Sequence, residues 1–166
     1  MQIVGDELQS LALATCNPLN FDLLGRSAFN RYYYATFLIT RKTLAIMQSN
    51  WKGTAHAEIP NLLENALRKP VSARLKNQIR LGLIDEGDKS RILTNINIAG
   101  CELAQLLRHA YHARILADYE PEIPLIKQND MIMLESYKLT TAKEWPSRAE
   151  LLCKRLLRNW KEVGLA

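Results

Sequence analysis

Five side chains near the end of one predicted helix are of the kinds that metal-free RNA cleavage requires. Arg108, His112, Arg114, Asp118 and Tyr119 lie in the segment LRHAYHARILADYEP, residues 107–121, in which Pro121 must end the helix. Histidine can move the proton of a ribose 2′-hydroxyl or of a leaving oxygen, because its pKa lies near neutrality. Arginine can hold the phosphate and stabilise the charge that grows on it. The segment is therefore a candidate catalytic site, one that needs no metal if the 2′-hydroxyl is the nucleophile.

Two stripes of side chains are predicted on this helix, because successive residues turn by about 100°. One stripe holds Arg108, His112 and Tyr119, and the neighbouring stripe holds Tyr111, Arg114 and Asp118. His109 is predicted to point away from both. Each stripe thus places a permanent cation beside a phenol.

The same spacing also has a purely structural interpretation. Arg114 and Asp118 are four residues apart, the spacing of a common ion pair within a helix. Cations near the C-terminal end of a helix interact favourably with its dipole, which alone would account for Arg114 and His112. A tyrosine before a Glu-Pro break, such as Tyr119, is often a packing anchor. The pattern leaves both interpretations open.

Five further residues are candidates for binding nucleic acid, namely Arg26, Arg31, His56, Lys154 and Arg158. Arg26 and Arg31 lie on a long predicted helix, and the face that begins at Arg26 could equally be a core seam with a polar end. His56 follows Gly53 in a predicted loop, where a single histidine is usually just solvated. Lys154 and Arg158 share one side of the last predicted helix, which is either a solvated face or a stripe that contacts nucleic acid.

The composition excludes several classes of protein. The 166 residues are about one domain's worth, and 48% hydrophobic with 23% charged residues is ordinary for a globular protein. No apolar run approaches the length of about 18 residues that spans a membrane, and the N-terminus lacks a signal-peptide pattern. We therefore expect a cytoplasmic protein without a membrane segment. A net charge of +5 and a pI of about 9.2 favour a polyanionic partner, but no compact run of lysines and arginines localises it.

The three cysteines, Cys16, Cys101 and Cys153, lie far apart in the sequence and form no Cys-x-x-Cys pair. This spacing supports neither a disulfide framework nor a zinc site, and the odd count is consistent with reduced thiols. The sequence therefore predicts a protein that holds no metal ion and no cofactor.

Helical periodicity runs through nearly the whole chain, and no segment alternates as a half-buried strand would. The segments expected to be helical are 6–15, 23–47, 60–68, 72–84, 92–117, 128–142 and 147–163. Asn20 or Asp22 is expected to cap the second helix, Pro70 to end the third, and Ser147 to begin a capping box that opens the last. Residues 50–58 should form a loop, and 85–90 either a turn or the start of the next helix. Two long helices with several shorter ones predict an all-α helical bundle.

Three motifs, in this order, resemble those of the HEPN superfamily (higher eukaryotes and prokaryotes nucleotide-binding). GRSAFNRYYYATFLITRKTL, residues 25–44, is similar to the long second helix of those domains. TAHAEI, residues 54–59, resembles a histidine-containing loop that follows in one branch. YHARILADYEPE, residues 111–122, is similar to that branch's Leu-Arg-x-x-Ala-Asp-Tyr-x-Pro motif, through Arg114, Asp118, Tyr119 and Pro121. The resemblance covers about residues 5–142.

The resemblance implies a single helical domain over residues 1–166, with two long antiparallel helices and a C-terminal helical extension over 143–166. It also implies a homodimer and a group rich in ribonucleases of toxin–antitoxin, CRISPR-associated and antiviral systems. Their signature is arginine, four to six residues, then histidine, at the dimer interface. Arg114 matches the arginine, but Tyr119 stands where a histidine would follow, and only three residues separate Arg108 from His112.

Two hypotheses therefore stand at the level of sequence. The first is a HEPN-like, metal-independent endoribonuclease, or a degenerate relative, of a toxin–antitoxin or antiviral defence system. Arg108 and Arg114 would hold phosphate, His112 would move protons, and Tyr119 would orient the phosphate or replace the histidine. The second is a catalytically inactive module that binds a nucleotide or nucleic acid, or an adaptor for a partner protein such as an antitoxin or defence component.

Overall fold

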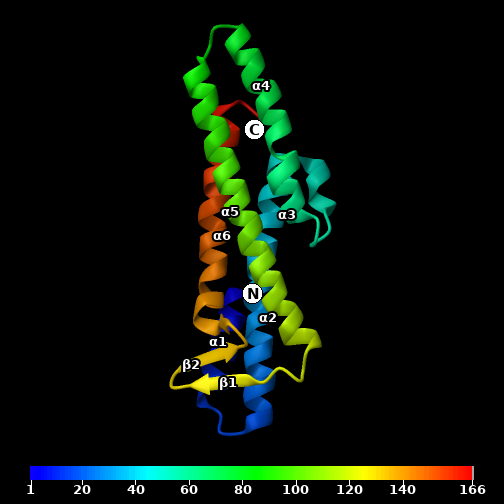
Figure 1. Cartoon of the computed structure of the whole chain (residues 1–166), viewed down its shortest axis with the longest axis vertical. Coiled ribbons are helices and arrows are strands. Elements are labelled where there is room, and N and C mark those ends of the chain that lie inside the picture. The colour runs from blue at the N-terminus through cyan, green and yellow to red at the C-terminus, as the bar shows by residue number, and fades with distance from the viewer. Residues whose placement is uncertain (166) are drawn as a thin grey trace. The chain divides into compact units, whose positions relative to one another are not determined.

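The computed structural model describes residues 1–165 and confirms an all-α helical bundle, to which a small sheet is added (Figure 1). The α-helices are α1 (Gln2–Ala14), α2 (Pro18–Met47), α3 (Ile59–Asn61), α4 (Arg68–Arg80), α5 (Glu86–Tyr119) and α6 (Leu139–Glu162). A 3₁₀ helix, η1 (Ser49–Gly53), and a π-helical turn, η2 (Leu62–Ala66), lie between α2 and α4. The strands are β1 (Leu125–Gln128), β2 (Met131–Leu134) and β3 (Tyr137–Lys138). Within the described residues no helix is long and apolar enough to cross a membrane.

The chain forms two compact units. Unit 1 comprises Met1–Leu38 and Leu107–Arg148, and unit 2 comprises Ile39–Leu106 and Ala149–Ala166. The helices α2, α5 and α6 each contribute one part to unit 1 and the other part to unit 2. The polar segment at the end of α5 therefore belongs to unit 1, whereas the basic residues Lys154 and Arg158 in the last turns of α6 belong to unit 2.

In unit 1, α2 and α5 run antiparallel. Asn30 contacts Asp118, and Tyr33, one turn later in α2, contacts Tyr111, two turns earlier in α5. The core of this unit is apolar and largely aromatic, with Phe29, Tyr32, Ile132, Leu134 and Trp145 all fully buried. The ring centroids of Phe29 and Trp145 are 6.4 Å apart. This packing fixes the last turns of α5 against α2 and the start of α6.

The first helix lies against α2 because residue 5 is glycine. A Cβ at Gly5 would fall 2.7 Å from Cε1 of Tyr32, closer than such atoms pack. The Tyr32 hydroxyl lies 2.9 Å from Oδ1 of Asp6 and 2.9 Å from Oε1 of Gln9. Burial, with the Asp6 carboxylate, raises the pKa of Tyr32 above its usual value, so that the hydroxyl stays protonated as a donor.

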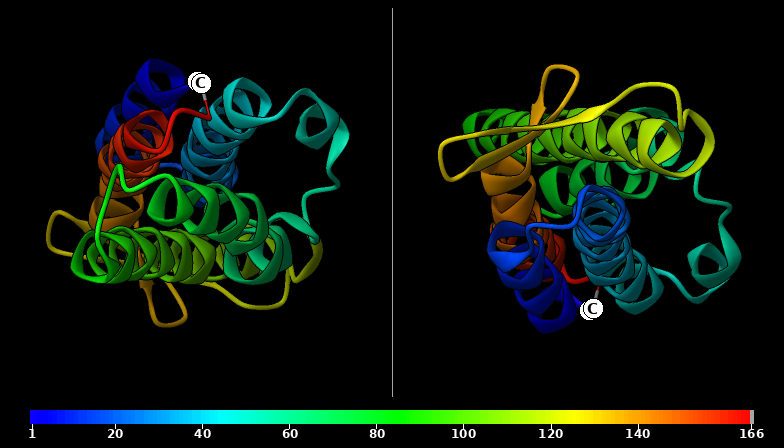
Figure 2. Two further views of the ribbon diagram at one scale, coloured as in Figure 1. Left: turned by 90° about the horizontal axis from the view of Figure 1, so that it is seen from above. Right: turned by 90° about the horizontal axis from the view of Figure 1, so that it is seen from below.

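A three-stranded antiparallel sheet in the order β1-β2-β3 occupies most of 125–138, so the predicted helix over 128–142 is wrong. Leu125 pairs with Leu134 and Gln128 with Met131, around a turn in which Asn129 has φ 55°. Asparagine accepts this left-handed conformation readily, which suits a two-residue hairpin. Alternate residues of β2 are buried, namely Ile132 and Leu134. The strands cross the helices of unit 1 rather than following them (Figures 1 and 2).

In unit 2, Pro70 does not end a helix as expected but lies in the first turn of α4. The amide of Leu67 bonds to the carbonyl of Leu62 at 3.0 Å, five residues back, which is the π-helical turn η2. The helix thus restarts at Arg68, where the missing amide of Pro70 falls among donors that have no helical partner anyway. Gly100 of α5 lies against this turn, since a Cβ there would be 2.8 Å from the carbonyl oxygen of Leu63.

Several helix ends also differ from expectation. Asn17, rather than Asn20 or Asp22, caps α2, because its Oδ1 accepts from the amides of Leu19 and Asn20 at 2.9 and 3.2 Å. Asp85 caps α5 by accepting from the amide of Asp88 at 2.8 Å, so the segment 85–90 begins a helix.

Ser147 opens no helix, because α6 runs unbroken through Pro146 from Leu139. Proline removes one helical hydrogen bond, but here both Pro146 and its neighbour Trp145 are buried. Packing of these two side chains therefore maintains the helix across a residue that usually interrupts one.

Candidate functional site

The arginine of the predicted signature is engaged within its own helix. Arg114 Nε lies 2.8 Å from Oδ2 of Asp118, and Arg114 Nη2 donates to the hydroxyl of Tyr119 at 3.3 Å. The Arg114 guanidinium also lies over the Tyr119 ring, 4.9 Å from its centroid. On the other side, Nδ2 of Asn30 donates to Oδ1 of Asp118. Asp118 therefore holds Arg114 in place, and Arg114 in turn orients Tyr119.

His112 is oriented by a residue that the sequence did not single out. Its Nδ1 lies 2.8 Å from the hydroxyl of Tyr137 in β3, and the two ring centroids are 5.8 Å apart. The imidazole is exposed, and among residues 1–165 Nε2 has no hydrogen-bond partner. A hydroxyl can both accept from and donate to Nδ1, so Tyr137 can hold the ring whether or not it is protonated. A fixed imidazole with a solvent-facing nitrogen is the arrangement of a general acid or base.

His109 does not point away from this group, as the helical spacing had suggested. Its ring centroid lies 4.7 Å from that of Tyr137 and 5.8 Å from that of Trp145. Burial lowers the pKa of His109, and the charges of His112 and Arg148 lower it further. Burial also raises the pKa of Tyr137, with a contribution from Glu135, so the phenol remains neutral. Both histidines thus flank one neutral tyrosine.

Arg108 is exposed and lies one helical turn before His112, on the same side of α5. Unit 1 therefore carries two pairs of candidate side chains near the end of α5, which we call the helix-end cluster. One pair is Arg108 with the oriented His112, and the other is Arg114 with its partner Asp118. Tyr119 is largely exposed beside the second pair.

Arg26 has a structural position. Only 8% of it is exposed, and its Nε pairs with Asp22 at 2.7 Å. Its Nη1 donates to the carbonyl oxygens of Leu116, Ala117 and Glu120, and its Nη2 to those of Pro121 and Ile123. These carbonyls lie in the last turn of α5 and just beyond it, where no helical amide can reach them. Arg26 thus fixes the end of the helix that carries the cluster.

The other candidates for binding nucleic acid are dispersed. Arg31 is partly exposed in unit 1, with Nη1 3.8 Å from the sulfur of Met1. His56 is exposed in the turn before α3, in unit 2. Lys154 pairs with Glu150 at 2.7 Å on the surface of α6. Of the five candidates, Arg158 alone lines a cleft described next.

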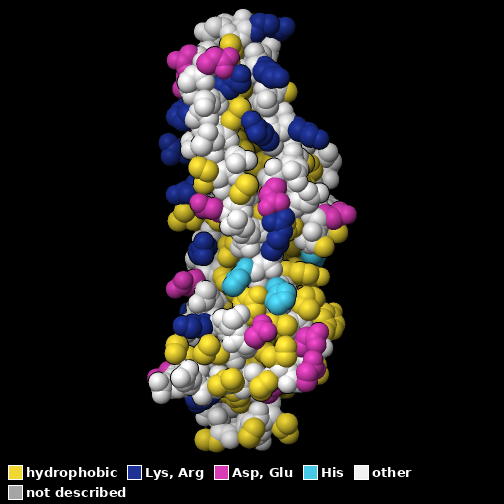
Figure 3. Space-filling view, in the orientation of Figure 1, with side chains coloured by type: hydrophobic (Ala, Val, Ile, Leu, Met, Phe, Trp, Pro, Cys, Tyr) yellow, Lys and Arg dark blue, Asp and Glu magenta, His cyan; other side chains and the backbone are white. Residues whose placement is uncertain are grey.

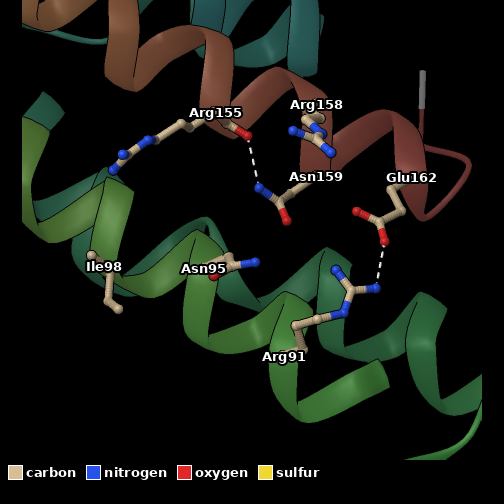
Figure 4. A pocket seen from close by; sticks show the side chains of 7 residues that line it. All are labelled: Arg91, Asn95, Ile98, Arg155, Arg158, Asn159 and Glu162. Carbon is tan, nitrogen blue, oxygen red and sulfur yellow. Dashed lines mark hydrogen bonds and ion pairs between the residues drawn. The ribbon is translucent and has the colours of Figure 1, made fainter. Parts of the chain in front are cut away.

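A cleft of about 400 Å³ in unit 2 lies between α5 and α6, and we call it the basic cleft (Figure 4). Its lining residues are Arg91, Asn95, Ile98, Arg155, Arg158, Asn159 and Glu162. Arg91 pairs with Glu162 at 2.6 Å and with Asp88 at 3.3 Å. Among residues 1–165, neither Arg155 nor Arg158 has an ion-pair partner. The cleft therefore keeps a positive charge.

The excess positive charge of the chain belongs to unit 2. This unit has 14 lysines and arginines against eight aspartates and glutamates, a formal charge of +6. Unit 1 has eight against nine, a formal charge of −1. Figure 3 shows lysine and arginine side chains gathered over α4 and the first half of α5. Folding thus collects basic residues that the sequence scatters.

Five polar residues of the basic cleft were missed at the level of sequence, namely Arg91, Asn95, Arg155, Asn159 and Glu162. Each helix carries its members at helical spacing, 91, 95 and 98 on α5 and 155, 158, 159 and 162 on α6. That spacing was a usable signal for each stripe. Nothing in the sequence indicated that the two stripes face each other.

Within residues 1–165, no three His, Cys, Asp or Glu side chains are grouped so that they could hold a metal ion. Comparison of the chain with protein-family models, with curated proteins and with solved structures finds no match.

Proposed function

We propose that this chain is a HEPN-like, RNA-acting protein, and that His112 is the proton-transfer group of a metal-independent endoribonuclease. The observation that carries the proposal is the 2.8 Å contact between Nδ1 of His112 and the Tyr137 hydroxyl, which orients an exposed histidine whose Nε2 has no hydrogen-bond partner among residues 1–165. An oriented imidazole of this kind can take the proton of a 2′-hydroxyl and return one to the leaving oxygen. Arg108, one turn away, supplies a cation for the phosphate.

The excess positive charge in unit 2 supports RNA as the class of substrate, because phosphate contacts dominate the affinity of proteins for nucleic acids. A toxin–antitoxin or antiviral defence setting, with a homodimer and a protein partner, follows from the resemblance in motif order. These parts of the proposal concern the biological setting, and the chemistry at His112 does not depend on them.

A second candidate function is an inactive RNA-binding or adaptor module. It is favoured by the state of Arg114, which is paired with Asp118 and packed on Tyr119 rather than directed at solvent. A phosphate could bind Arg114 only by displacing this carboxylate. If Arg114 is the essential arginine of the superfamily signature, its engagement describes a site that has lost its chemistry.

The test is cleavage of a defined single-stranded RNA in the presence of a chelator. His112→Ala should reduce the rate by roughly 10²- to 10⁴-fold, the usual contribution of a placed proton-transfer group. Gln105→Ala changes an exposed polar residue two turns earlier on α5 and should leave the rate unaltered. Circular dichroism should show that both variants remain folded.

Two results would contradict the proposal. Wild-type protein that cuts no RNA favours the inactive module, whereas His112→Ala protein that cuts as fast as wild type removes His112 from the chemistry. If wild type does cut RNA, Arg108→Ala and Arg114→Ala separate the roles of the two arginines. If Arg108→Ala cuts much more slowly and Arg114→Ala does not, Arg108 is the arginine that holds the phosphate beside His112.

A further inference from the structure

The charges that line the basic cleft are not balanced within the described chain. Three guanidiniums, those of Arg91, Arg155 and Arg158, line one concave site, and Glu162 is the one carboxylate among its lining residues. Glu162 is committed to Arg91 at 2.6 Å. Like charges that line one cleft destabilise a folded protein unless an anion neutralises them. The cleft therefore has the electrostatics of an anion-binding site.

The polar side chains of the cleft are directed so that they can contact a ligand. In Figure 4 the Arg158 guanidinium and the Asn159 and Asn95 amides lie around one open space between the two helices. Asn159 is 7% exposed, and its Nδ2 donates to the carbonyl of Arg155 at 2.8 Å. This hydrogen bond fixes the Asn159 amide and leaves its Oδ1 as an acceptor.

From this arrangement we propose that the basic cleft binds the phosphate backbone of single-stranded RNA, with Arg155 and Arg158 as the phosphate-contacting residues. Guanidinium groups match phosphate oxygens through paired N–H donors, which is why arginine is preferred over lysine at such sites. The choice of RNA as the polyanion rests on the proposed function, whereas the preference for phosphate rests on the cleft itself. The site lies in unit 2 and is distinct from the helix-end cluster of unit 1.

The surroundings of the cleft favour a strand over an isolated phosphate ion. Residues 91, 95 and 98 of α5 line the cleft, and their neighbours 90, 93, 94 and 97 line a second hollow of about 220 Å³ that includes Arg68. A third hollow of about 450 Å³ carries Arg68, Lys69 and Lys76 along α4. These basic hollows continue from α6 over α5 to α4, as an extended polyanion would require.

The experiment measures binding of a fluorescent single-stranded oligouridine by anisotropy, across a series of salt concentrations. The double variant Arg155→Ala/Arg158→Ala should bind at least tenfold more weakly at low salt. Because each phosphate contact on a single strand contributes about 0.7 to the slope of log K against log salt, the slope should fall by about 1.4. The matched control is Lys52→Ala/Arg80→Ala, which removes two exposed charges of unit 2 outside the cleft and should change the affinity far less.

A gain-of-function variant makes the test independent of folding defects. Glu162→Gln removes the carboxylate that holds Arg91 and should therefore strengthen binding and steepen the salt slope. Inorganic tripolyphosphate should compete with the oligonucleotide on wild type and fail to bind the double variant. Weaker binding for Glu162→Gln, or equal losses for the double variant and its control, would overturn the assignment.

The outcomes separate this inference from the proposed function. His112→Ala should bind oligouridine with unchanged affinity while cutting it slowly, because His112 belongs to the other unit. If wild type binds tripolyphosphate in the cleft but binds no RNA, the cleft is a phosphate site and the proposed RNA function is wrong. If the Arg155→Ala/Arg158→Ala variant binds RNA as tightly as wild type, the cleft is not the RNA-binding site, and the proposed function is unaffected.

Discussion

Arg26 of α2 donates a hydrogen bond of 3.2 Å to the main-chain carbonyl of Leu116, in the last turn of α5. The same guanidinium reaches four further carbonyls, the shortest contact being 2.5 Å to Ile123. One buried arginine thus replaces the amides that the end of a helix lacks. The position of the helix-end cluster depends on this contact, although Arg26 itself takes no part in the proposed chemistry.

Arg26→Met should therefore reduce the free energy of unfolding by roughly 3 kcal/mol, because several buried carbonyls lose a charged donor at once. Urea denaturation followed by circular dichroism measures the change. The control is Arg148→Met, which makes the same substitution at an exposed residue of the same unit. Equal midpoints for the two variants would show that the cap contributes nothing to stability.

Tyr137→Phe should leave the fold intact and disturb only the orientation of His112. Without the hydroxyl, Nδ1 loses its 2.8 Å partner, and the imidazole should rotate more freely. NMR relaxation of the His112 ring measures this mobility, and the cleavage rate should fall by roughly 10- to 100-fold, as for other orienting partners. Slower cleavage with an unchanged ring mobility would give Tyr137 a packing role alone.

His109 should make the protein less stable as the pH falls. Burial and the neighbouring His112 and Arg148 lower its pKa in the folded state, so the unfolded chain binds the proton more readily. Between the lowered value and the ordinary value of about 6.5, stability should rise with pH and fall on acidification. Unfolding free energies of wild type and His109→Gln at several pH values between 5 and 8 measure the difference. A parallel pH dependence in both proteins would contradict the assignment.

Gly100→Ala should destabilise unit 2, although alanine is usually favoured over glycine within a helix by about 1 kcal/mol. The added Cβ would lie 2.8 Å from the Leu63 carbonyl oxygen, which belongs to the π-helical turn and cannot rotate away. We expect a loss of about 1–3 kcal/mol, as for other overpacked sites. Gly53→Ala is the control, because a Cβ there meets nothing within 4 Å. Thermal denaturation should show a clearly lower melting temperature for Gly100→Ala than for Gly53→Ala.

A homodimer through residues 108–119 is the fifth prediction. Tyr111 and Tyr119 are exposed aromatic side chains on this segment, and tyrosines commonly anchor interfaces. Analytical ultracentrifugation at micromolar concentration should give a mass near twice 19.0 kDa. Tyr119→Asp should shift the protein to monomer, whereas Leu151→Asp, at an exposed residue of α6 in unit 2, should not. A monomeric wild type would remove any composite site between copies.

The long helices could be predicted because their apolar residues recur at helical spacing over many turns. The sheet could not, because its strands have two to four residues and the alternation in β2 covers only Met131 to Leu134. The predicted helix end at Pro70 and the predicted helix start at Ser147 are wrong for a related reason. A π-helical turn before Pro70 and buried packing around Pro146 accommodate a proline within each helix.

The candidate sites were predictable only as far as they are local. The Arg114–Asp118 pair follows from a spacing of four residues and was expected. The partner of His112 lies 25 residues away, in a segment assigned to the wrong kind of element. Arg91 and Glu162 are 71 residues apart, so only the packing of α5 on α6 could show that they meet.

The Arg91–Glu162 pair has a consequence for which anions the basic cleft would admit. Glu162 is tethered to the site and so acts as a competitor at a high effective concentration, which no change in buffer can dilute. A monovalent anion gains too little from one arginine to replace it. A chain of linked phosphates can first engage Arg155 and Arg158 and then displace the carboxylate from Arg91 in a step that is intramolecular. The cleft would therefore select anions by their valence. It would bind chloride and acetate weakly and would bind ligands that carry several linked negative charges.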